Sequence, residues 1–374
     1  MPTTRAAANW AASHVAALVE MWVIIAQHSG LVGAWRLTMV CKASRGGVKQ
    51  WLRTLPRLVI CGGYGAAGPT DDMWVLDLED MRWTYNTNLK CQRANHACCA
   101  VRGTVVVLAG RDSQYGCTAS VEILGYEPGK TEEHVFMKDL PQLSIGALNV
   151  PTAVSIDENE SNEGQVLLIG GADIDTFTSA VYIVDLATGV CTPQCPLLRA
   201  RMGCAAARLP DGRVVCVGGR NGGSDTLFDD EVGNLQTVSL TAEVLEPSDD
   251  GMPGGQWREL PAMNQQRYGG GGCVLSDGRF AVFGGIDDIG IDTTSCQVLT
   301  LDGEEWSWSA LPPMHEARTG FACVAVGGCV IVAGGESSVT AEVYEEELGR
   351  WKRLPHGIQR SWMGSALMTH RQQL

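Results

Sequence analysis

The sequence predicts an all-β fold in which six four-stranded sheets form the blades of a closed β-propeller over residues 56–374. Two observations lead to this prediction. Glycine is abundant, at 45 of the 374 residues, and it weakens helix interiors while it favours tight turns. In addition, one short apolar strand that ends in two small residues recurs along the chain. Residues 1–55 precede the first copy and are predicted to be helical.

The recurring strand has six copies, with the sequences RLVICGG, TVVVLAG, QVLLIGG, RVVCVGG, RFAVFGG and CVIVAGG. They end at Gly63, Gly110, Gly171, Gly219, Gly285 and Gly335. Their spacing is roughly fifty residues, with longer loops in two copies, which is typical of one class of propeller repeat. Both faces of each strand are apolar, as expected for a sheet that is packed between two others.

Three further strands complete each repeat in a fixed order. A strand such as AEVLEP follows the glycines, and a tryptophan strand comes next in most copies, with Trp83, Trp257, Trp306 or Trp308, and Trp351. An arginine then opens an inner strand, as in RMGCAAARL, and an Asp-Gly turn often joins it to the next Gly-Gly strand. Each repeat is therefore predicted to be an antiparallel meander. The second and third copies have Phe136 and Cys191 in place of the tryptophan.

The C-terminal stretch RSWMGSALM, from Arg360, matches the inner strand of the repeat but has no Gly-Gly strand after it. The first Gly-Gly strand, Arg57 to Gly63, is the only copy with no such strand before it. We therefore expect the C-terminal strand to complete the first blade, so that six blades close into a ring. Closure leaves no sheet edge unpaired, which removes a route to aggregation.

The order of Gly-Gly, a VYxxD/E-type strand and tryptophan resembles the kelch repeat over about residues 57–370. This resemblance implies a six-bladed kelch-type propeller that binds a protein or peptide at the loops of one face. In kelch substrate adaptors, arginines at the start of the inner strand line the peptide pocket. The matching positions here are Arg93, Arg201, Arg267, Arg318 and Arg360.

These arginines have two interpretations. Their guanidinium groups could hold an acidic peptide at the mouth of the propeller, or they could bond backbone carbonyls of the neighbouring blade. Aspartates in nearby loops, such as IDDIGID, would offset part of their charge. Aromatic residues of the same loops are predicted to add apolar contact area: Tyr64, Tyr115, Phe177, Tyr268 and Trp362.

The N-terminal segment has the apolar spacing of one helix face, and Gly30 is expected to break the helix before a second helical stretch over residues 31–52. The cluster Arg36, Leu37, Val40, Cys41 and Lys42 resembles the core of F-box helices, although the Leu-Pro start of most F-boxes is missing. The resemblance implies binding to a Skp-type linker and a cullin, through Leu18, Trp22, Ile25, Leu31, Trp35 and Val40. The alternative is a helical cap that packs on the propeller.

Composition argues against several other classes of function. The net charge of −14 disfavours nucleic acid and anionic membranes, and no run of Lys and Arg offers a basic patch. No apolar stretch reaches the length of a membrane span. The 14 cysteines lie mostly within apolar runs, as free thiols do in a reducing compartment, so the cytoplasm or the nucleus is expected.

No catalytic motif and no metal-ligand spacing is present, so we predict a protein without catalytic activity, cofactor or metal. The alternative is a copper radical oxidase of the galactose-oxidase type, because those enzymes also use kelch-type propellers with tyrosine, cysteine and two histidines at the metal. His96, His315 and His356 would be the histidines here.

Overall fold

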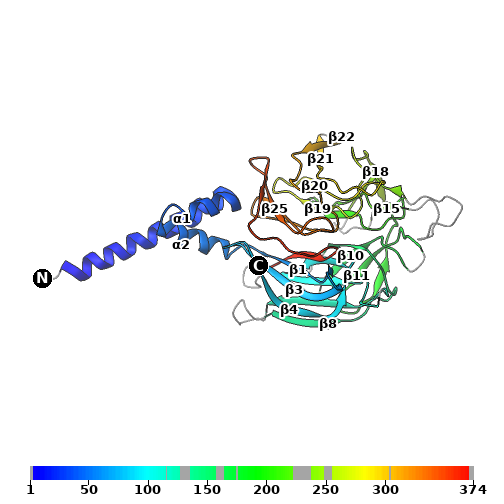
Figure 1. Cartoon of the computed structure of the whole chain (residues 1–374), viewed down its shortest axis with the longest axis horizontal. Helices are drawn as coiled ribbons and strands as arrows, with labels where there is room; N and C mark the ends of the chain where they lie inside the picture. The colour runs from blue at the N-terminus through cyan, green and yellow to red at the C-terminus, as the bar shows by residue number, and fades with distance from the viewer. Residues whose placement is uncertain are drawn as a thin grey trace.

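The computed structural model describes residues 3–114, 116–126, 135–156, 164–173, 176–221, 237–247, 255–302 and 305–369, with side chains from residue 18 onward. In these residues six four-stranded sheets form a ring, and a helical segment extends from one side of it (Figure 1). This confirms the predicted six-bladed propeller with a short N-terminal helical segment.

Each blade is an antiparallel meander, listed here from the channel outward. Blade 1 contains β27 (Gly364–Met368), β1 (Arg57–Cys61), β3 (Gly68–Asp77) and β4 (Arg82–Arg93), with the short β2 (Tyr64–Gly65) beside β3. Blade 2 contains β5 (Ala97–Val101), β6 (Thr104–Leu108), β7 (Val121–Tyr126) and β8 (Val135–Leu140). Blade 3 contains β9 (Thr152–Ser155), β10 (Gln165–Ile169), β11 (Val181–Asp185) and β12 (Cys191–Pro193).

The second half of the ring repeats this order. Blade 4 contains β13 (Ala205–Arg208), β14 (Val214–Val217), β17 (Ala242–Leu245) and β18 (Trp257–Leu260). A two-stranded ribbon of β15 (Arg220–Asn221) and β16 (Thr237–Val238) interrupts it. Blade 5 contains β19 (Gly271–Val274), β20 (Phe280–Phe283), β21 (Cys296–Asp302) and β22 (Glu305–Leu311). Blade 6 contains β23 (Ala322–Val326), β24 (Cys329–Ala333), β25 (Ala341–Glu345) and β26 (Arg350–Arg353).

The two ends of the propeller sequence meet in blade 1. β27 pairs with β1 in antiparallel register from Arg57–Met368 to Cys61–Gly364. The C-terminal strand therefore completes the first blade, as the sequence predicts. We call the pairing of β27 with β1 inside blade 1 the seam, because the two ends of the propeller sequence meet there.

The glycines that end each second strand connect neighbouring blades. The last glycine donates its N–H to the carbonyl of the residue that opens the next blade, at 2.8 to 2.9 Å in all six cases, for example Gly219 to Arg267. The preceding residue is glycine in five copies because the blades approach closely: a Cβ on Gly218 would lie 2.5 Å from the Arg267 carbonyl oxygen. The exception, Ala109, precedes the one blade that opens with Leu148 instead of arginine.

The helical segment consists of α1 (Thr3–Leu37) and α2 (Lys42–Leu52). Gly30 has non-helical backbone angles and kinks α1, as predicted, while the expected second stretch is divided by a turn at residues 38–41. Cys41 caps α2 through a reciprocal hydrogen bond pair with Ser44. Among the described residues, neither helix combines the length and the hydropathy that a membrane span needs.

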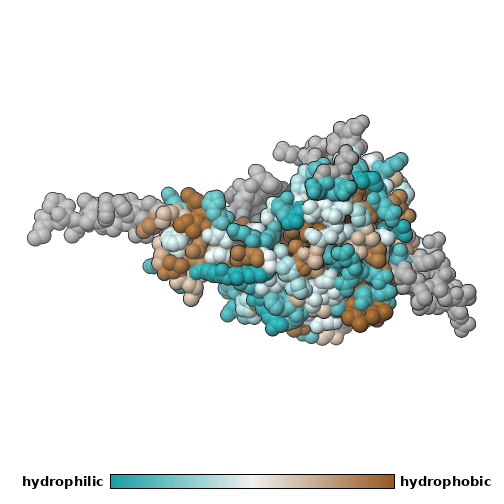
Figure 2. All heavy atoms as spheres, turned by 90° about the horizontal axis from the view of Figure 1, so that it is seen from above, coloured by the Kyte–Doolittle hydropathy of each residue, from teal (hydrophilic) through white to brown (hydrophobic). Residues whose placement is uncertain are grey.

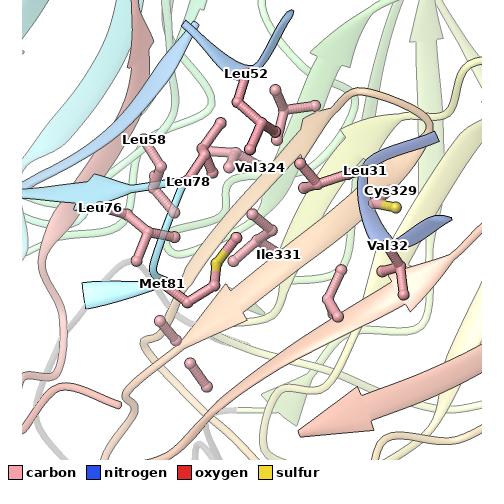
Figure 3. Packing of buried hydrophobic residues seen from close by; sticks show 14 of the residues in the cluster. Leu31, Val32, Leu52, Leu58, Leu76, Leu78, Met81, Val324, Cys329 and Ile331 are labelled. Atoms are coloured by element: carbon pink, nitrogen blue, oxygen red, sulfur yellow. The ribbon is translucent and has the colours of Figure 1, made fainter. Parts of the chain in front are cut away.

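The C-terminal part of the helical segment packs on blades 1 and 6, at the end of the ring opposite the starts of the inner strands. Leu31 and Leu52 lie against Leu58, Val324 and other buried apolar side chains of those blades (Figure 3). The Leu31 amide donates to the Gly327 carbonyl at 3.1 Å, and the Trp35 indole donates to the Leu78 carbonyl at 2.8 Å. These contacts fix the segment to the propeller, while its N-terminal part projects away from the ring (Figure 1).

Candidate functional site: the propeller mouth

The loops that follow the Gly-Gly strands meet the starts of the inner strands at one face of the ring, which we call the mouth. Isolated β-bridges join the two kinds of segment, including Ala94–Arg111, Met202–Arg220 and Tyr268–Ile286. The sequence-based expectation that these segments share one end of the channel is therefore confirmed. The residues that open the inner strands and the first residues of the loops form the candidate site.

A closed ring of backbone hydrogen bonds surrounds the channel at the mouth. Six residues, one from each blade, have positive φ angles between 50° and 65°: Asn95, Val150, Gly203, Gly269, Gly320 and Trp362. Each donates its N–H to the carbonyl of the equivalent residue in the preceding blade, at 2.6 to 3.1 Å. The Asn95 backbone N–H donates to the Trp362 carbonyl, which closes the circle between blade 2 and blade 1. We call these residues the mouth ring.

Two aromatic side chains lie over the mouth ring. The Trp362 indole covers two ring glycines, since a Cβ on Gly269 or on Gly320 would come within 2.5 to 2.7 Å of its atoms. Tyr268 packs beside Trp362, with 5.1 Å between ring centroids, and the Trp362 indole N–H donates to the Glu336 carboxylate. A tryptophan with φ of 51° is strained, by about 1–3 kcal/mol, and such strain often marks functional positions.

Four of the five predicted arginines do not line the mouth. The side chains of Arg93, Arg201, Arg267 and Arg318 are at most 2% exposed. Their guanidinium groups point into the blade that they open and donate to backbone carbonyls there, as Arg318 does to Gly334 at 2.9 Å and to Thr340 at 2.7 Å. This corrects the prediction that they contact a ligand. The alternative, that the arginines bond backbone carbonyls, agrees with these contacts, although the carbonyls bonded by Arg201, Arg267 and Arg318 lie in the blade that each arginine opens.

A glutamate on the third strand explains the burial of these arginines. Glu122, Glu243 and Glu342 each accept a hydrogen bond from the arginine of their blade, and the Arg318–Glu342 distance is 2.9 Å. The second oxygen of each carboxylate accepts a backbone N–H of the incoming linker, for example His315 N–H at 2.8 Å. The sequence contained this signal, in the glutamates of VEIL, AEVL and AEVY, but sequence reasoning missed it.

Blade 5 has the same arrangement but lacks the negative charge of the carboxylate, because Gln297 takes the place of the glutamate. Arg267 donates to the Gly284 carbonyl at 2.6 Å and to Ser295, and Gln297 accepts the Asn264 N–H at 3.0 Å. Burial without a carboxylate partner lowers the pKa of Arg267 to about 10. Arg267 is therefore a buried cation that is held by neutral groups.

Blade 1 departs further, because Trp74 occupies the position of the glutamate. By register, Trp74 pairs with Ile60 as Glu243 pairs with Cys216. Arg360 forms its ion pair with Asp72 instead, and the Arg360 side chain stays 19% exposed. Burial tends to raise the pKa of Asp72, but hydrogen bonds from Arg360 and Trp74 hold it below its ordinary value.

Two other arginines lie at the mouth, and sequence reasoning missed both. Arg111 and Arg220 directly follow Gly-Gly-type strands and are only partly buried. The Arg220 guanidinium lies over the Tyr268 ring, at 5.3 Å from its centroid. Burial raises the pKa of Tyr268 to about 12. Their position immediately after AG and GG was the signal that could have identified them.

The remaining predicted mouth aromatics are placed as follows. The Tyr64 hydroxyl accepts a hydrogen bond from the side-chain amide of Asn95 at 3.4 Å, which brings Tyr64 to the mouth ring. Phe177 is buried in a small apolar cluster with Val150, Ala172 and Met202. Tyr115 lies outside the described residues. Tyr64, Tyr268 and Trp362 therefore gather at the mouth.

Behind the mouth ring, the channel holds a cavity of about 200 Å³ lined by small inner-strand residues and by His96. Burial and the nearby Arg93 lower the pKa of His96 to about 3, and its Nε2 accepts the Gly364 N–H at 3.0 Å. His315 contacts Glu342 at 2.7 Å. Across the described residues no group of three or more His, Cys, Asp or Glu is placed to hold a metal ion. The copper-oxidase alternative stays a prediction.

The predicted F-box-like residues divide into two groups. Leu31 is fully buried against the propeller, and Trp35 is tied to Leu78, so these two cannot meet a partner without movement. Leu18 and Val40 are exposed, while Trp22 and Ile25 are half-buried. With Met21, Ile24 and Met39, the exposed residues place apolar surface on the helical segment, seen as brown areas in Figure 2. We call Leu18, Met21, Ile24, Met39 and Val40 the helical patch.

Comparison with known proteins agrees with the repeat seen in the sequence. No protein-family model matches the chain. Kelch-like protein 33 of Homo sapiens is 29% identical over 105 residues, which are 27% of this chain and 20% of that protein. Two F-box/kelch-repeat proteins of Arabidopsis thaliana are 30% identical over 117 residues and 38% identical over 98 residues. These matches cover 27% and 25% of this chain, and 30% and 26% of the relatives.

The chain thus spans less than a third of the length of each of these relatives. Among solved structures, YjhT matches with a TM-score of 0.53 and 14% identity, over 68% of this chain and 81% of that one, which supports the fold alone. The chain is similar in sequence to kelch-repeat and F-box/kelch-repeat proteins, and it folds as the six-bladed propeller that its own repeats predict.

Proposed function

We propose that this chain is a protein-interaction adaptor with two binding surfaces. The mouth, centred on Trp362 and Tyr268, binds one protein or peptide, and the helical patch binds a second protein. One observation carries the proposal: the partly exposed aromatic residues of the mouth and the exposed apolar residues of the helical patch lie at opposite ends of one propeller. The contacts of Leu31 and Trp35 fix the helical segment to that propeller. A propeller with these two surfaces holds its two partners at a fixed distance from each other.

At the mouth, the chemistry suits a peptide with an apolar side chain beside a carboxylate. Trp362 and Tyr268 offer aromatic contact area, which dominates many interfaces. Arg111 and Arg220 supply positive charge next to them, and Glu336 holds the indole in place. Replacing Trp362 with Ala should abolish co-purification of the mouth partner, while Val190→Ala, at an exposed position in the turn between β11 and β12, should not. Unchanged partners in the Trp362 variant would contradict this role.

The finer proposal is that the adaptor serves a cullin-type ubiquitin ligase in the cytoplasm or the nucleus. Support comes from the F-box-like cluster around Val40 and from the F-box/kelch-repeat names of two relatives. All fourteen cysteines are free thiols, which suits a reducing compartment. In this role the helical patch would bind a Skp-type linker, and the mouth would present a substrate for ubiquitin transfer.

Binding to a purified Skp-type protein tests the finer proposal on the full chain. Exchanging Leu18, Met21 and Ile24 for Asp should abolish this binding and leave the fold intact, because all three are exposed. A matched control exchanges Ile289 and Ile291, which are also exposed but lie in a mouth loop. If the unaltered chain does not bind, the ligase role is wrong, whereas the mouth experiment still decides the adaptor role.

A further inference from the structure

Two cysteine side chains meet at the boundary between blade 1 and blade 2. The Sγ atoms of Cys61, the last residue of β1, and Cys98, in the inner strand β5, are 3.9 Å apart. The two residues are 37 positions apart in the sequence, so only the fold brings them together. Cys61 is fully buried, whereas Cys98 is partly exposed. We call Cys61 and Cys98 the thiol pair.

The closing strand β27 allows this contact because it begins with a glycine. Gly364 pairs with Cys61 in the register of β1 and β27, and β27 lies beside β5. A Cβ on Gly364 would lie 2.6 Å from the Cβ of Cys98, so the Cys98 side chain occupies the space that a larger residue would need. A side chain of blade 2 can therefore reach across the end of β27 to the second strand of blade 1.

Small molecules can reach the thiol pair from the channel. Cys98 lines the cavity of about 200 Å³ behind the mouth ring, and so do the mouth-ring residues Asn95, Gly203 and Gly269. The same cavity therefore extends from the mouth to the Cys98 side chain. Because Cys61 is 0% exposed, a reagent in the channel meets Cys98 first.

The surroundings of the thiol pair favour a neutral, apolar group. Val59, Met73 and other buried apolar side chains pack around Cys61 and Cys98. The hydrogen bond to Cys61 and, second, burial raise the pKa of Cys98 well above its ordinary value. The Cys98 thiol is therefore protonated at neutral pH and reacts slowly. A disulfide carries no charge, so it suits this environment better than a thiolate does.

We propose that the thiol pair is an oxidation site, at which hydrogen peroxide that enters the channel converts Cys61 and Cys98 into a disulfide. Cys98 loses its proton and attacks one peroxide oxygen; the O–O bond breaks, the sulfur becomes a sulfenic acid, and the proton leaves in a molecule of water. The Cys61 sulfur then displaces the sulfenic hydroxyl, which leaves with the Cys61 proton as a second water. Two thiols are thereby oxidised, and one peroxide is reduced to two waters.

The disulfide locks the closed ring at its discontinuous blade. It joins β1 to β5 across the end of β27, and so it links blade 1, which contains both ends of the propeller sequence, to blade 2. The Asn95 N–H bonds the Trp362 carbonyl across the same boundary, which thus gains a covalent bond beside its hydrogen bond. Disulfides in reducing compartments are mostly transient and redox-sensing, and the thiol pair fits that role.

Peptide mapping of the full chain tests the proposal. After slow oxidation with hydrogen peroxide, a non-reduced tryptic digest should contain residues 58–82 linked to residues 94–102. The midpoint of thermal unfolding should rise by about 5 °C, because the link closes a loop in the unfolded chain. Dithiothreitol should reverse both changes. Absence of the linked peptides after complete oxidation would overturn the proposal.

Cys98→Ala removes the attacking thiol, and Cys99→Ala is the matched control. Cys99 is the next residue of β5, but its side chain is buried on the other face, between blades 2 and 3, where burial raises its pKa to about 12. The linked peptides and the rise in the midpoint should disappear in the Cys98 variant and persist in the Cys99 variant. Cys98→Ser, which keeps the size of the side chain, makes the same test if the alanine variant is insoluble. A rise that persists without Cys98, or that needs Cys99, would contradict the assignment.

Discussion

Blade 6 and blade 1 are neighbours, and the equivalent arginine makes different contacts in each of them. In blade 6, Arg318 is fully buried and bonds Glu342 and two backbone carbonyls of its own sheet. In blade 1, Arg360 is partly exposed and bonds Asp72, because Trp74 takes the glutamate position. Blade 6 comes from one continuous stretch of chain, whereas blade 1 is assembled from both ends.

The comparison shows that different interactions hold the strands of a blade together and close the ring of blades. The continuous blades 2, 4 and 6 gain an arginine–glutamate pair that ties the first, second and third strands together. The seam blade instead relies on the long pairing of β27 with β1. Four predictions test this division, in order of expected effect.

Removal of residues 364–374 should have the largest effect. It deletes β27, which leaves the edge of β1 unpaired and removes the inner strand against which β5 of blade 2 packs. We expect insoluble protein instead of a mildly destabilised one, as measured by soluble yield and size-exclusion chromatography. A soluble, folded product would show that closure is dispensable.

Exchanging each arginine for methionine should reduce the free energy of unfolding by a different amount in blades 6, 5 and 1. Arg318→Met leaves the buried Glu342 without its cation and should reduce the free energy of unfolding by about 3–5 kcal/mol. Arg267→Met leaves no charge behind and should cost about 1–3 kcal/mol. Arg360→Met, at a partly exposed pair, should cost about 1 kcal/mol or less. Denaturant unfolding measures all three, and equal effects at Arg318 and Arg360 would contradict the comparison.

Gln297→Glu should make blade 5 resemble blade 6. The new carboxylate would face Arg267, whose pKa should return from about 10 toward its ordinary value, and it could still accept the Asn264 N–H. We expect a gain of about 1–2 kcal/mol at neutral pH. Gln297→Met, which offers no acceptor to Asn264, is the control and should destabilise. No gain would mean that the cost of burying the carboxylate matches its attraction to Arg267.

Acid should weaken blade 6 more than blade 5. Burial tends to raise the pKa of Glu342, but hydrogen bonds from Arg318 and from His315 hold it below its ordinary value of 4.5. A depressed carboxyl pKa stabilises the fold above the unfolded pKa, and this contribution is lost as the pH falls through the folded pKa. Between pH 7 and pH 3, the Glu342→Gln variant should therefore lose less stability than the unaltered protein. Parallel pH profiles would contradict this assignment.

The repeat period predicted the fold well, because six copies of one strand fix both the blade number and the need for closure. Trp362 and Tyr268 lie at the mouth, as their place at the start of an inner strand predicts, while their role in partner binding stays a prediction. Tyr64 followed from its position after Gly63 in the same way.

The arginine side chains were misplaced because the position in the sequence predicts where the backbone of a residue lies. It does not predict where the end of a long side chain lies. Arg201 opens an inner strand at the mouth, yet its guanidinium reaches back to Glu243 on the third strand. That pairing joins residues 42 positions apart, and it depends on strand register.

The mouth ring has a consequence for exchange of its amides with deuterated solvent. Its six hydrogen bonds form a closed cycle, so no amide of the ring is an end that can fray. Four of the six join blades that are each built from continuous chain, while the Asn95 and Trp362 amides bond across the boundaries of blade 1. If β27 detaches transiently, these two amides lose their protection together, while the other four keep theirs until a continuous blade opens.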